Sequence, residues 1–509
     1  KPVEIAFDGF EQRAIQMEAP AGRIGDLQAA KKKLLYLRLP RVGSEDAPAP
    51  DDEEDDASDS RSQLVYFDLE KKKEEKILDG VVHFQVCGNG EKVLVHTADA
   101  WAFVDPEKDQ KIEDKIAIAG LTATIDPRDE WSQILTDAGR LVRDYFYQAD
   151  THHVDWTAVV ERYKGALPDC TSREDVDFLI REMLGELNCG HTYDDPPPDM
   201  DDSKPASPVG LLGCDWVLEQ GAYKIARIVG GGAYDADARS PLAIPGVDVK
   251  AGEFLLAVND VAVDVTRDVY AAFDGLADKA TWITVNGSPR FDGVERRMLV
   301  KPIASESQLR YRDWVAHNRE LVAEASNGRI GYVHVPDTGI HGQNELVRQF
   351  MGAFDKDALI VDERWNSGGQ IPTRFIELLN RPVTNFWAVR HGEDWAWPPV
   401  GHRGPKCMLI NEASGSGGDC FPYFFREAGL GTLIGRRTWG GLVGLSGNPS
   451  FIDGSSITVP TFGFYERDGT WGVEGHGVEP DLEVIDDPAL MVDGSDPQRQ
   501  AAIQHLQEE

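Results

Sequence analysis

The spacing of apolar residues changes several times along this chain of 509 residues, and this constrains its fold more than any single motif does. Residues 1–126 alternate short β-type runs with turns, residues 127–203 follow a helical period, and residues 206–302 return to short strands. From residue 305 to residue 490, strands and helices alternate. No single layer architecture accommodates all of these patterns, so we predict a multidomain α+β protein.

The first of these segments, residues 1–126, has short strands at a spacing typical of β-propeller blades. About three blades would fit, which is too few to close a ring, so we expect a partial propeller and a chain that is a fragment of something longer. Residues 44–61 interrupt the strands and include the run Asp51-Asp52-Glu53-Glu54-Asp55-Asp56. Like charges at this density repel one another, so we expect a disordered surface loop there.

The remaining segments predict further domains. Residues 127–203 are expected to form a small helical domain, and Gly190 follows its last helix as a stop signal. Residues 206–302 look like a PDZ domain, in which residues 266–276 are expected to be helical. Residues 305–490 predict an α/β domain with parallel strands, followed by a C-terminal tail at 491–509. In a PDZ domain, backbone amides of one loop bind a peptide carboxylate. The corresponding loop here would consist of Val209, Gly210, Leu211, Leu212 and Gly213.

Charge and cysteine content exclude several classes of protein. The formal net charge of −35 would repel nucleic acid and anionic membranes, and no apolar run is long enough to span a bilayer. The six cysteines contain no CxxC pair, so neither a zinc site nor a disulfide framework is indicated. We therefore expect a soluble protein of the reducing cytoplasm.

A glycine-rich turn after the strand-like residues 406–410 is the most informative feature for chemistry. It reads Asn411-Glu412-Ala413-Ser414-Gly415-Ser416-Gly417-Gly418-Asp419 and precedes a helix. A serine on a sharp strand-to-helix turn has an exposed hydroxyl beside free backbone amides, as an acyl-transfer nucleophile requires. Ser416 is preferred over Ser414 because two glycines follow it and leave their amides open to an oxyanion. The alternative is a glycine-rich loop with a serine that only caps the helix.

A second glycine turn, Asn366-Ser367-Gly368-Gly369, follows the strand-like residues 359–362. In a parallel sheet it would emerge at the same carboxyl edge as the Ser416 turn. The N–H of Gly368 could then supply an additional oxyanion donor, although a plain strand-to-helix connection remains the alternative.

A serine nucleophile needs a base. No lysine occurs after Lys406, which excludes a downstream lysine base in the same domain and favours a histidine. His191 follows a helix stop and lies in a loop, where functional residues concentrate. Late in the chain, Glu474 could orient a catalytic histidine, and His476 offers another imidazole; a solvated turn is the alternative for this segment.

Across nearly the whole chain, the order of segments resembles the C-terminal half of the tricorn protease family, relatives of the tail-specific (C-terminal-processing) serine peptidases. The motifs that carry the resemblance occur in the family's order: Gly185-Glu186-Leu187-Asn188-Cys189-Gly190-His191, Asp362-Glu363-Arg364-Trp365-Asn366-Ser367-Gly368-Gly369, the Ser416 turn, Ile434-Gly435-Arg436-Arg437-Thr438-Trp439-Gly440-Gly441-Leu442-Val443-Gly444 and Val473-Glu474-Gly475-His476-Gly477. The family's layout is a propeller, a helical domain, a PDZ domain and an α/β serine-hydrolase domain, which agrees with the segments above.

The resemblance implies a role for each matching residue. Ser416 would be the nucleophile, His191 the general base, and Glu474 a member of the hydrogen-bonded tetrad that orients the base. The amides of Gly417 and Gly368 would form the oxyanion hole. The family's remaining tetrad member is a serine directly before the histidine, where this chain has Gly190. A water or Thr192 would have to replace that hydroxyl, or activity would be weaker than in the archetype.

The function implied is that of a serine endopeptidase or oligopeptidase that cleaves unfolded or already shortened peptides without a metal or organic cofactor. The resemblance also implies a homo-oligomer, commonly a hexamer, with aminopeptidases as partners. The main alternative is a catalytically impaired PDZ-containing scaffold that binds peptides, for which Gly190 is the main support. A lipase-like esterase is disfavoured because Ser414 stands where a G-x-S-x-G elbow needs its first glycine, and because His191 lies upstream of the serine.

Overall fold

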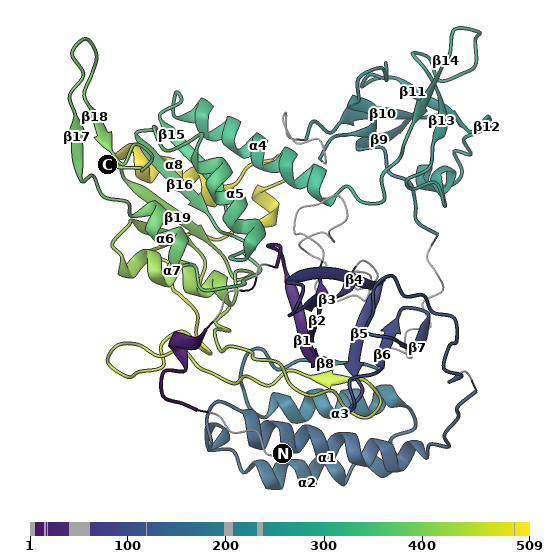
Figure 1. The fold of residues 1–509 in the computed structure, drawn as a ribbon. Helices are drawn as coiled ribbons and strands as arrows, with labels where there is room; N and C mark the ends of the chain where they lie inside the picture. Colours follow the sequence, from purple (N-terminus) through teal and green to yellow (C-terminus); the bar gives the residue numbers. More distant parts are fainter. Residues whose placement is uncertain are drawn as a thin grey trace. The chain divides into compact units, whose positions relative to one another are not determined.

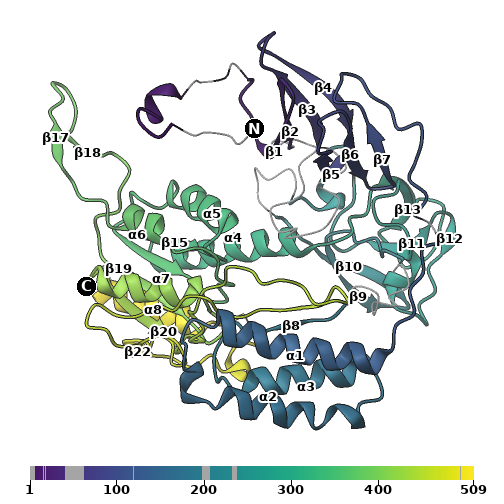
Figure 2. The same ribbon diagram turned by 60° about the horizontal axis from the view of Figure 1, so that its bottom comes forward.

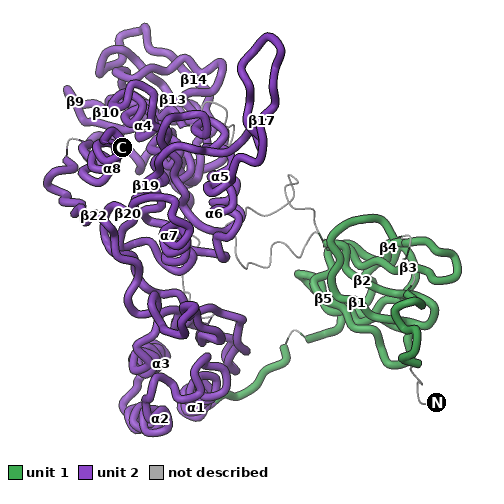
Figure 3. Tube along the Cα trace, turned by 90° about the vertical axis from the view of Figure 1, so that its left-hand side faces the viewer, with its two compact units in different colours: residues 1–125 green, residues 126–509 purple. Residues whose placement is uncertain are grey.

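The computed structural model describes residues 6–14, 17, 19–39, 62–118, 120–197, 207–231, 238–492 and 494–508. The chain divides into two compact units, residues 1–125 and 126–509 (Figure 3). The acidic run expected to form a disordered loop at residues 44–61 lies outside the described residues.

The first unit consists of two antiparallel meander sheets. The larger sheet has the order β1 (Ile24–Ala30), β2 (Lys33–Arg38), β3 (Gln63–Asp68) and β4 (Lys73–Asp79). The smaller one has the order β5 (Val81–Val86), β6 (Val93–Thr97) and β7 (Ala100–Val104), and a short 3-10 helix, Glu11–Arg13, precedes both. Buried residues of both sheets form one apolar core. The described part of this unit therefore holds two sheets where the sequence predicted about three blades.

The second unit begins with three helices: α1 (Pro127–Tyr145), α2 (Trp156–Lys164) and α3 (Arg173–Gly185). Asp126 caps α1 by accepting a hydrogen bond from the N–H of Arg128, and Pro127 occupies the first helical position, where its missing N–H costs nothing. Short 3-10 helices, Thr151–His153 and Leu167–Asp169, connect these elements. The helices bury a common apolar face, as their period predicted.

A segment from the end of the chain completes this helical core. Phe451, Ile457 and Val459 are buried among the residues of α1 and α3. The short strand β21 (Ser456–Ile457) also pairs with β8 (Asp194–Asp195), just after the helices (Figures 1 and 2). The base candidate His191 therefore lies next to a segment that the late part of the chain holds in place.

Next in the chain comes a mostly antiparallel sheet with the order β14 (Arg296–Val300), β13 (Thr281–Asn286), β11 (Phe254–Val258), β10 (Ala222–Ile228) and β9 (Cys214–Glu219), with β12 (Val261–Ala262) paired to β11. Two 3-10 helices, η6 (Pro241–Ala243) and η7 (Val269–Phe273), pack with it. The helix expected at residues 266–276 is thus much shorter. Asp268 caps its start, and Gly275, at φ +68°, turns the chain away soon after its end.

The last part of the second unit is a sheet in which every pairing is parallel. Its order is β15 (Ile330–His334), β16 (Ala358–Asp362), β19 (Lys406–Ile410), β20 (Thr432–Gly435) and β22 (Leu482–Glu483). One face is covered by α5 (Ile340–Phe350), α6 (Thr373–Leu379) and α7 (Gly417–Glu427). The other is covered by α4 (Ser307–Ala325) and α8 (Pro497–Glu508), as Figure 1 shows. A hairpin of β17 (Asn385–Trp387) and β18 (Trp395–Trp397) and a 3-10 helix, Pro488–Leu490, complete the described elements.

The expectation of a C-terminal tail at 491–509 is wrong for most of that segment. Helix α8 buries Ala502, Ile503 and Leu506 against the parallel sheet. Just before it, Asp496 accepts a hydrogen bond of 2.9 Å from the fully buried Arg364. An apolar face of so few residues is hard to recognise without its partner on the sheet.

Among the described residues, no helix combines the length and the apolar character that a membrane crossing requires.

Candidate active site

The two glycine turns meet because their strands are neighbours. β16 and β19 pair in parallel, so the turns that follow them emerge at the same edge of the sheet. The N–H of Gly415 donates to the carbonyl of Asn366 at 3.1 Å, which joins one turn to the other. The prediction that both turns share one carboxyl edge is confirmed.

Ser416 occupies the sharp turn between β19 and α7. Its backbone has φ +58° and ψ −114°, a conformation that residues other than glycine rarely adopt. The turn is held by Asp419, whose Oδ2 accepts a hydrogen bond of 2.8 Å from the N–H of Ser416. The competing Ser414 is fully buried, and its hydroxyl donates to the carbonyl of Glu363 at 2.9 Å. The geometry therefore favours Ser416 as the nucleophile.

Ser416 shares a pocket with the proposed base. The pocket has a volume of about 320 Å³ and is lined by His191, Tyr193, Asn366, Ser367, Glu412, Ala413, Gly415, Ser416 and Trp439. The fold thus brings together an imidazole from the helical part and a hydroxyl from the α/β part. His476 is 60% exposed, lies 3.5 Å from Glu479 and does not line this pocket.

Glu474 connects the loop of the base to a segment beside the nucleophile. Its Oε1 accepts hydrogen bonds from the N–H of Gly190 at 2.9 Å and from the thiol of Cys189 at 3.7 Å. Its Oε2 accepts from the N–H groups of Leu442 and Val443 at 2.6 and 2.9 Å. With four donors around it, this carboxylate fixes the position of residues 189–190.

Gly190 stands where the resemblance implied a serine. A Cβ atom there would lie 3.3 Å from Oε1 of Glu474 and 3.0 Å from Cα of Gly441. In place of a side-chain hydroxyl, the backbone N–H of Gly190 holds the carboxylate. The hydroxyl of Thr192 donates to the carbonyl of Cys189 at 3.3 Å, so Thr192 does not substitute for the serine.

The imidazole of His191 is half-buried, and its burial favours the neutral form. Burial lowers its pKa from the ordinary 6.5, while the nearby Glu474 carboxylate acts in the opposite direction. Its Nδ1 is buried and has no hydrogen-bond partner among the described residues. A neutral imidazole can accept a proton, which is what a general base must do.

The expected oxyanion donors differ from one another. Gly417 is the first residue of α7, so its N–H lies outside the helical ladder. Only glycine fits there, because a Cβ would lie 1.9 Å from Oγ1 of Thr338. The N–H of Gly368, in contrast, donates to Oδ1 of Asn366 at 2.9 Å. The Gly368 amide therefore already has a partner in its own turn, and its expected role as an oxyanion donor stays a prediction.

Gly369, whose amide the sequence analysis did not single out, lies close to the nucleophile turn. A Cβ on Gly417 would lie 3.1 Å from the nitrogen of Gly369, so this amide lies next to the start of α7. The signal was present in the sequence as the second glycine of the same turn, but only the structure distinguishes the two amides.

Asp419 is a second such residue, and it organises a segment that we call the strap, residues 438–443. Besides the N–H of Ser416, its carboxylate accepts hydrogen bonds from the hydroxyl of Thr438 at 2.5 Å and from the amides of Gly440 and Gly441 at 2.7 and 3.1 Å. Burial raises the pKa of Asp419, and these donors oppose that rise. Because Glu474 binds the next two amides of the strap, the two carboxylates join the nucleophile turn to the base loop.

The expected carboxylate-binding loop of the PDZ-like sheet uses several of its amides within the domain. The N–H groups of Gly210, Leu211 and Gly213 donate to the Phe273 carbonyl, the Ile303 carbonyl and Oε1 of Glu306, at 2.9, 2.8 and 2.6 Å. Val209 and Leu212 lie in the same stretch, and Leu212 is buried. Three of the five amides of residues 209–213 thus already have partners within the domain, and the binding of a peptide carboxylate by this loop stays a prediction.

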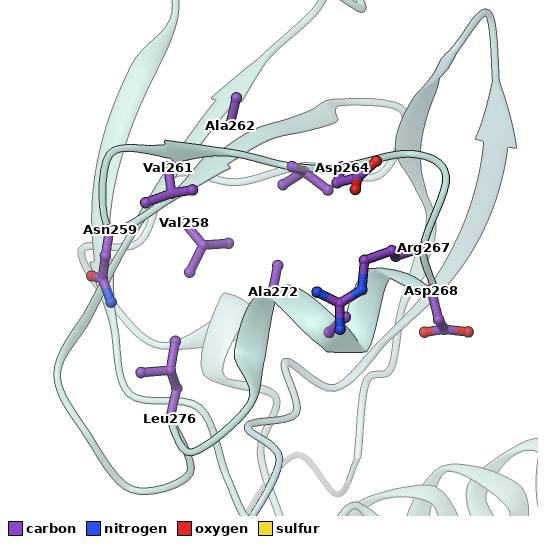
Figure 4. A pocket seen from close by; sticks show the side chains of 11 residues that line it. Val258, Asn259, Val261, Ala262, Asp264, Arg267, Asp268, Ala272 and Leu276 are labelled. Atoms are coloured by element: carbon purple, nitrogen blue, oxygen red, sulfur yellow. The ribbon is translucent and has the colours of Figure 1, made fainter.

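A cavity of this domain lies away from residues 209–213. It measures about 310 Å³ and is lined by the end of β11, by β12 and by η7. In Figure 4, Val258 and Val261 lie on one side of it, and Arg267 and Ala272 lie on the other.

Comparison with known proteins assigns three stretches of the chain to families. Residues 329–484 match the model of peptidase family S41, residues 210–305 match the tricorn protease PDZ domain, and residues 127–185 match the tricorn protease C1 domain.

Two curated relatives show how far the similarity extends. Tricorn protease homolog 1 of Streptomyces coelicolor is 35% identical over 508 residues, which cover 98% of this chain and 47% of the relative. Tricorn protease of Thermoplasma acidophilum is 30% identical over 446 residues, which cover 88% of this chain and 41% of the relative. The chain therefore spans about half the length of these relatives.

The fold has a counterpart among solved structures. A crystal structure of the tricorn protease superposes with a TM-score of 0.84 at 28% identity, covering 96% of this chain and 47% of that chain.

Proposed function

This chain belongs to the tricorn protease family, and on that premise we propose that it is a serine peptidase that hydrolyses peptide bonds through an acyl-enzyme. The observation that carries the proposal is the placement of Ser416 and His191 in one pocket, at the turn between β19 and α7. The alternative of a lipase-like esterase does not account for the PDZ and C1 domains. In addition, the order of His191 before Ser416 is not that of an α/β-hydrolase.

The mechanism follows from the residues of the pocket. His191 accepts the proton of the Ser416 hydroxyl, whose oxygen attacks the peptide carbonyl. The N–H of Gly417, with Gly369 as the neighbouring amide, stabilises the oxyanion; a donor of this kind typically lowers the barrier by about 3–4 kcal/mol. His191 then gives its proton to the leaving amine. Water activated by the same imidazole hydrolyses the acyl-enzyme.

Glu474 supports this chemistry without touching the nucleophile. Its carboxylate fixes the base loop through Gly190, and its negative charge stabilises the imidazolium that forms when His191 takes up a proton. The amide of Gly190 performs the anchoring that the missing serine hydroxyl would provide. This favours an active enzyme over the alternative, a peptide-binding scaffold that has lost activity.

The wider setting is also a proposal. By family membership we expect unfolded or pre-shortened peptides as substrates, a β-propeller that includes the two meander sheets, a homo-oligomer such as a hexamer, and cooperating aminopeptidases. A cytoplasmic location agrees with six cysteines, none of which forms a disulfide.

A fluorophosphonate probe tests the proposal directly, because only an activated serine reacts with it. The wild-type chain should be labelled and should cleave a fluorogenic peptide, and Ser416→Ala should lose both properties. Ser414→Ala is the matched control and should keep most of the labelling. Equal labelling of wild type and Ser416→Ala would assign the reaction to another residue, and an unlabelled wild type would favour the scaffold.

A further inference from the structure

Trp439 lies in the strap and is fixed to the nucleophile turn by its backbone. Its N–H donates to the carbonyl of Ser414 at 2.9 Å, and its neighbours Thr438 and Gly440 both bond to Asp419. Its indole is 46% exposed and lines the pocket that holds His191 and Ser416. A half-exposed ring with a rigid backbone can form a wall of an active site.

Two glycines leave space for this ring, and a third lies near it. A Cβ atom on Gly441 would lie 2.2 Å from Cζ3 of Trp439, and one on Gly415 would lie 2.7 Å from Cε3. A Cβ on Gly190 would lie 3.6 Å from Cη2. The indole therefore packs closely against Gly441 of the strap and Gly415 of the nucleophile turn, and it lies near Gly190 of the base loop.

The ring also contacts the proposed base. The ring centroids of Trp439 and His191 are 5.4 Å apart at an interplanar angle of 55°, a tilted contact. Glu474 reaches the base loop at the backbone of Gly190, and Nδ1 of His191 has no hydrogen-bond partner among the described residues. Because no hydrogen bond to Nδ1 fixes the rotation of the imidazole ring, packing against neighbouring side chains must determine it.

We propose that Trp439 is the positioning residue that orients the imidazole of His191 toward Ser416, and that it does so by packing against the ring. The proposal rests on the proposed peptidase function. Tyr193 is a second aromatic neighbour of the imidazole, with its ring centroid 6.0 Å from that of His191, farther than that of Trp439.

The test compares Trp439→Phe, Trp439→Leu and Trp439→Ala with wild type. If Trp439 positions the base, kcat for a short neutral peptide and the rate of fluorophosphonate labelling should fall about 10- to 100-fold in Trp439→Ala. Trp439→Phe should recover most of the loss, since a ring is restored. Trp282→Ala is the matched control, because Trp282 is 39% exposed on β13 and outside the pocket. A rise in KM with unchanged kcat would overturn the proposal and make Trp439 a substrate contact only.

A second readout does not depend on catalysis. The ring NMR signals of His191, assigned by their loss in His191→Gln, are titrated in wild type and in Trp439→Leu, which preserves an apolar residue if the alanine variant fails to fold. Tyr193 and Glu412, which line the pocket, and Glu474, whose charge acts on His191, are unchanged between the two proteins. Removing the indole should expose the imidazole and move its pKa up toward 6.5.

An unchanged titration would overturn the positioning role. A shifted titration in a chain whose wild type neither labels nor cleaves would uphold it and refute the peptidase instead.

Discussion

At the scale of single residues, the ionisation of His191 decides the pH range in which the proposed base works. The neutral imidazole is the active form, so activity should fall as the pH drops through its pKa. Burial places that pKa below 6.5, so the acidic limb of a plot of kcat/KM against pH is expected below pH 6.5. Stability should follow the same direction: the contribution of neutral His191 is complete above 6.5 and is lost as the pH falls from there toward the lowered pKa. An acidic limb above pH 7 would contradict this assignment.

Replacing each of two buried carboxyl groups near the nucleophile turn by an amide should lower the free energy of unfolding by different amounts. Glu363 is fully buried, and burial raises its pKa well above the usual range, which favours its neutral form. Glu363→Gln should therefore change the free energy of unfolding by less than about 1 kcal/mol. Asp419 accepts four hydrogen bonds. The NH₂ group of an asparagine in its place cannot accept, so it would face N–H and O–H donors without bonding to them. Asp419→Asn should cost about 2–3 kcal/mol.

Chemical denaturation of the two variants at pH 7 measures the difference, each serving as the control for the other. A larger loss in Glu363→Gln than in Asp419→Asn would show that Glu363 is ionised.

Some site residues could be predicted from the sequence because their signal is local. Ser416 stands in a glycine-rich turn between a strand and a helix, and His191 follows a helix stop. Asp419 and Trp439 could not, because their importance comes from contacts with the strap and with glycines far away in the chain. The state of the Gly368 amide depends on the rotamer of Asn366, which no pattern encodes.

At the scale of elements, a buried ion pair holds α8 to the parallel sheet. Arg364 has no exposed surface, and its guanidinium lies 2.6 Å from Asp362 and 2.9 Å from Asp496. Asp496→Ala leaves part of this buried charge without a partner and should lower the free energy of unfolding by about 3–5 kcal/mol. Asp357→Ala is the control, since Asp357 pairs with Arg329 on the surface, where such pairs contribute about 0–1 kcal/mol.

Equal losses for the two alanine variants in thermal denaturation would mean that α8 does not depend on Arg364.

The same comparison shows which elements a sequence reveals. The strands β16 and β19 are continuous buried runs bounded by turns, and their parallel pairing was predictable from the helix between them. Helix α8 was missed because its apolar residues become meaningful only opposite the sheet. The 3-10 helix η7 was predicted too long, because the local pattern does not contain the positive φ of Gly275 that redirects the chain.

At the scale of the whole molecule, the net charge of −35 opposes the assembly that family membership leads us to propose. Screening should relieve this repulsion, because the Debye length falls from about 10 Å at 0.1 M salt to about 3 Å at 1 M. Sedimentation velocity at a fixed protein concentration should therefore show a larger assembled fraction at high salt. Dissociation by salt would instead indicate an interface held by ion pairs.

The carboxylate of Glu474, bonded to the backbone of Gly190, also sets an order of events during synthesis. During translation, His191 is synthesised first, Ser416 much later, and Glu474 last. The β21–β8 pairing that steadies the base likewise waits for residues 456–457. A nascent chain thus lacks the complete set of proposed catalytic residues until translation has passed residue 474, so the proposed peptidase activity would begin only after that point.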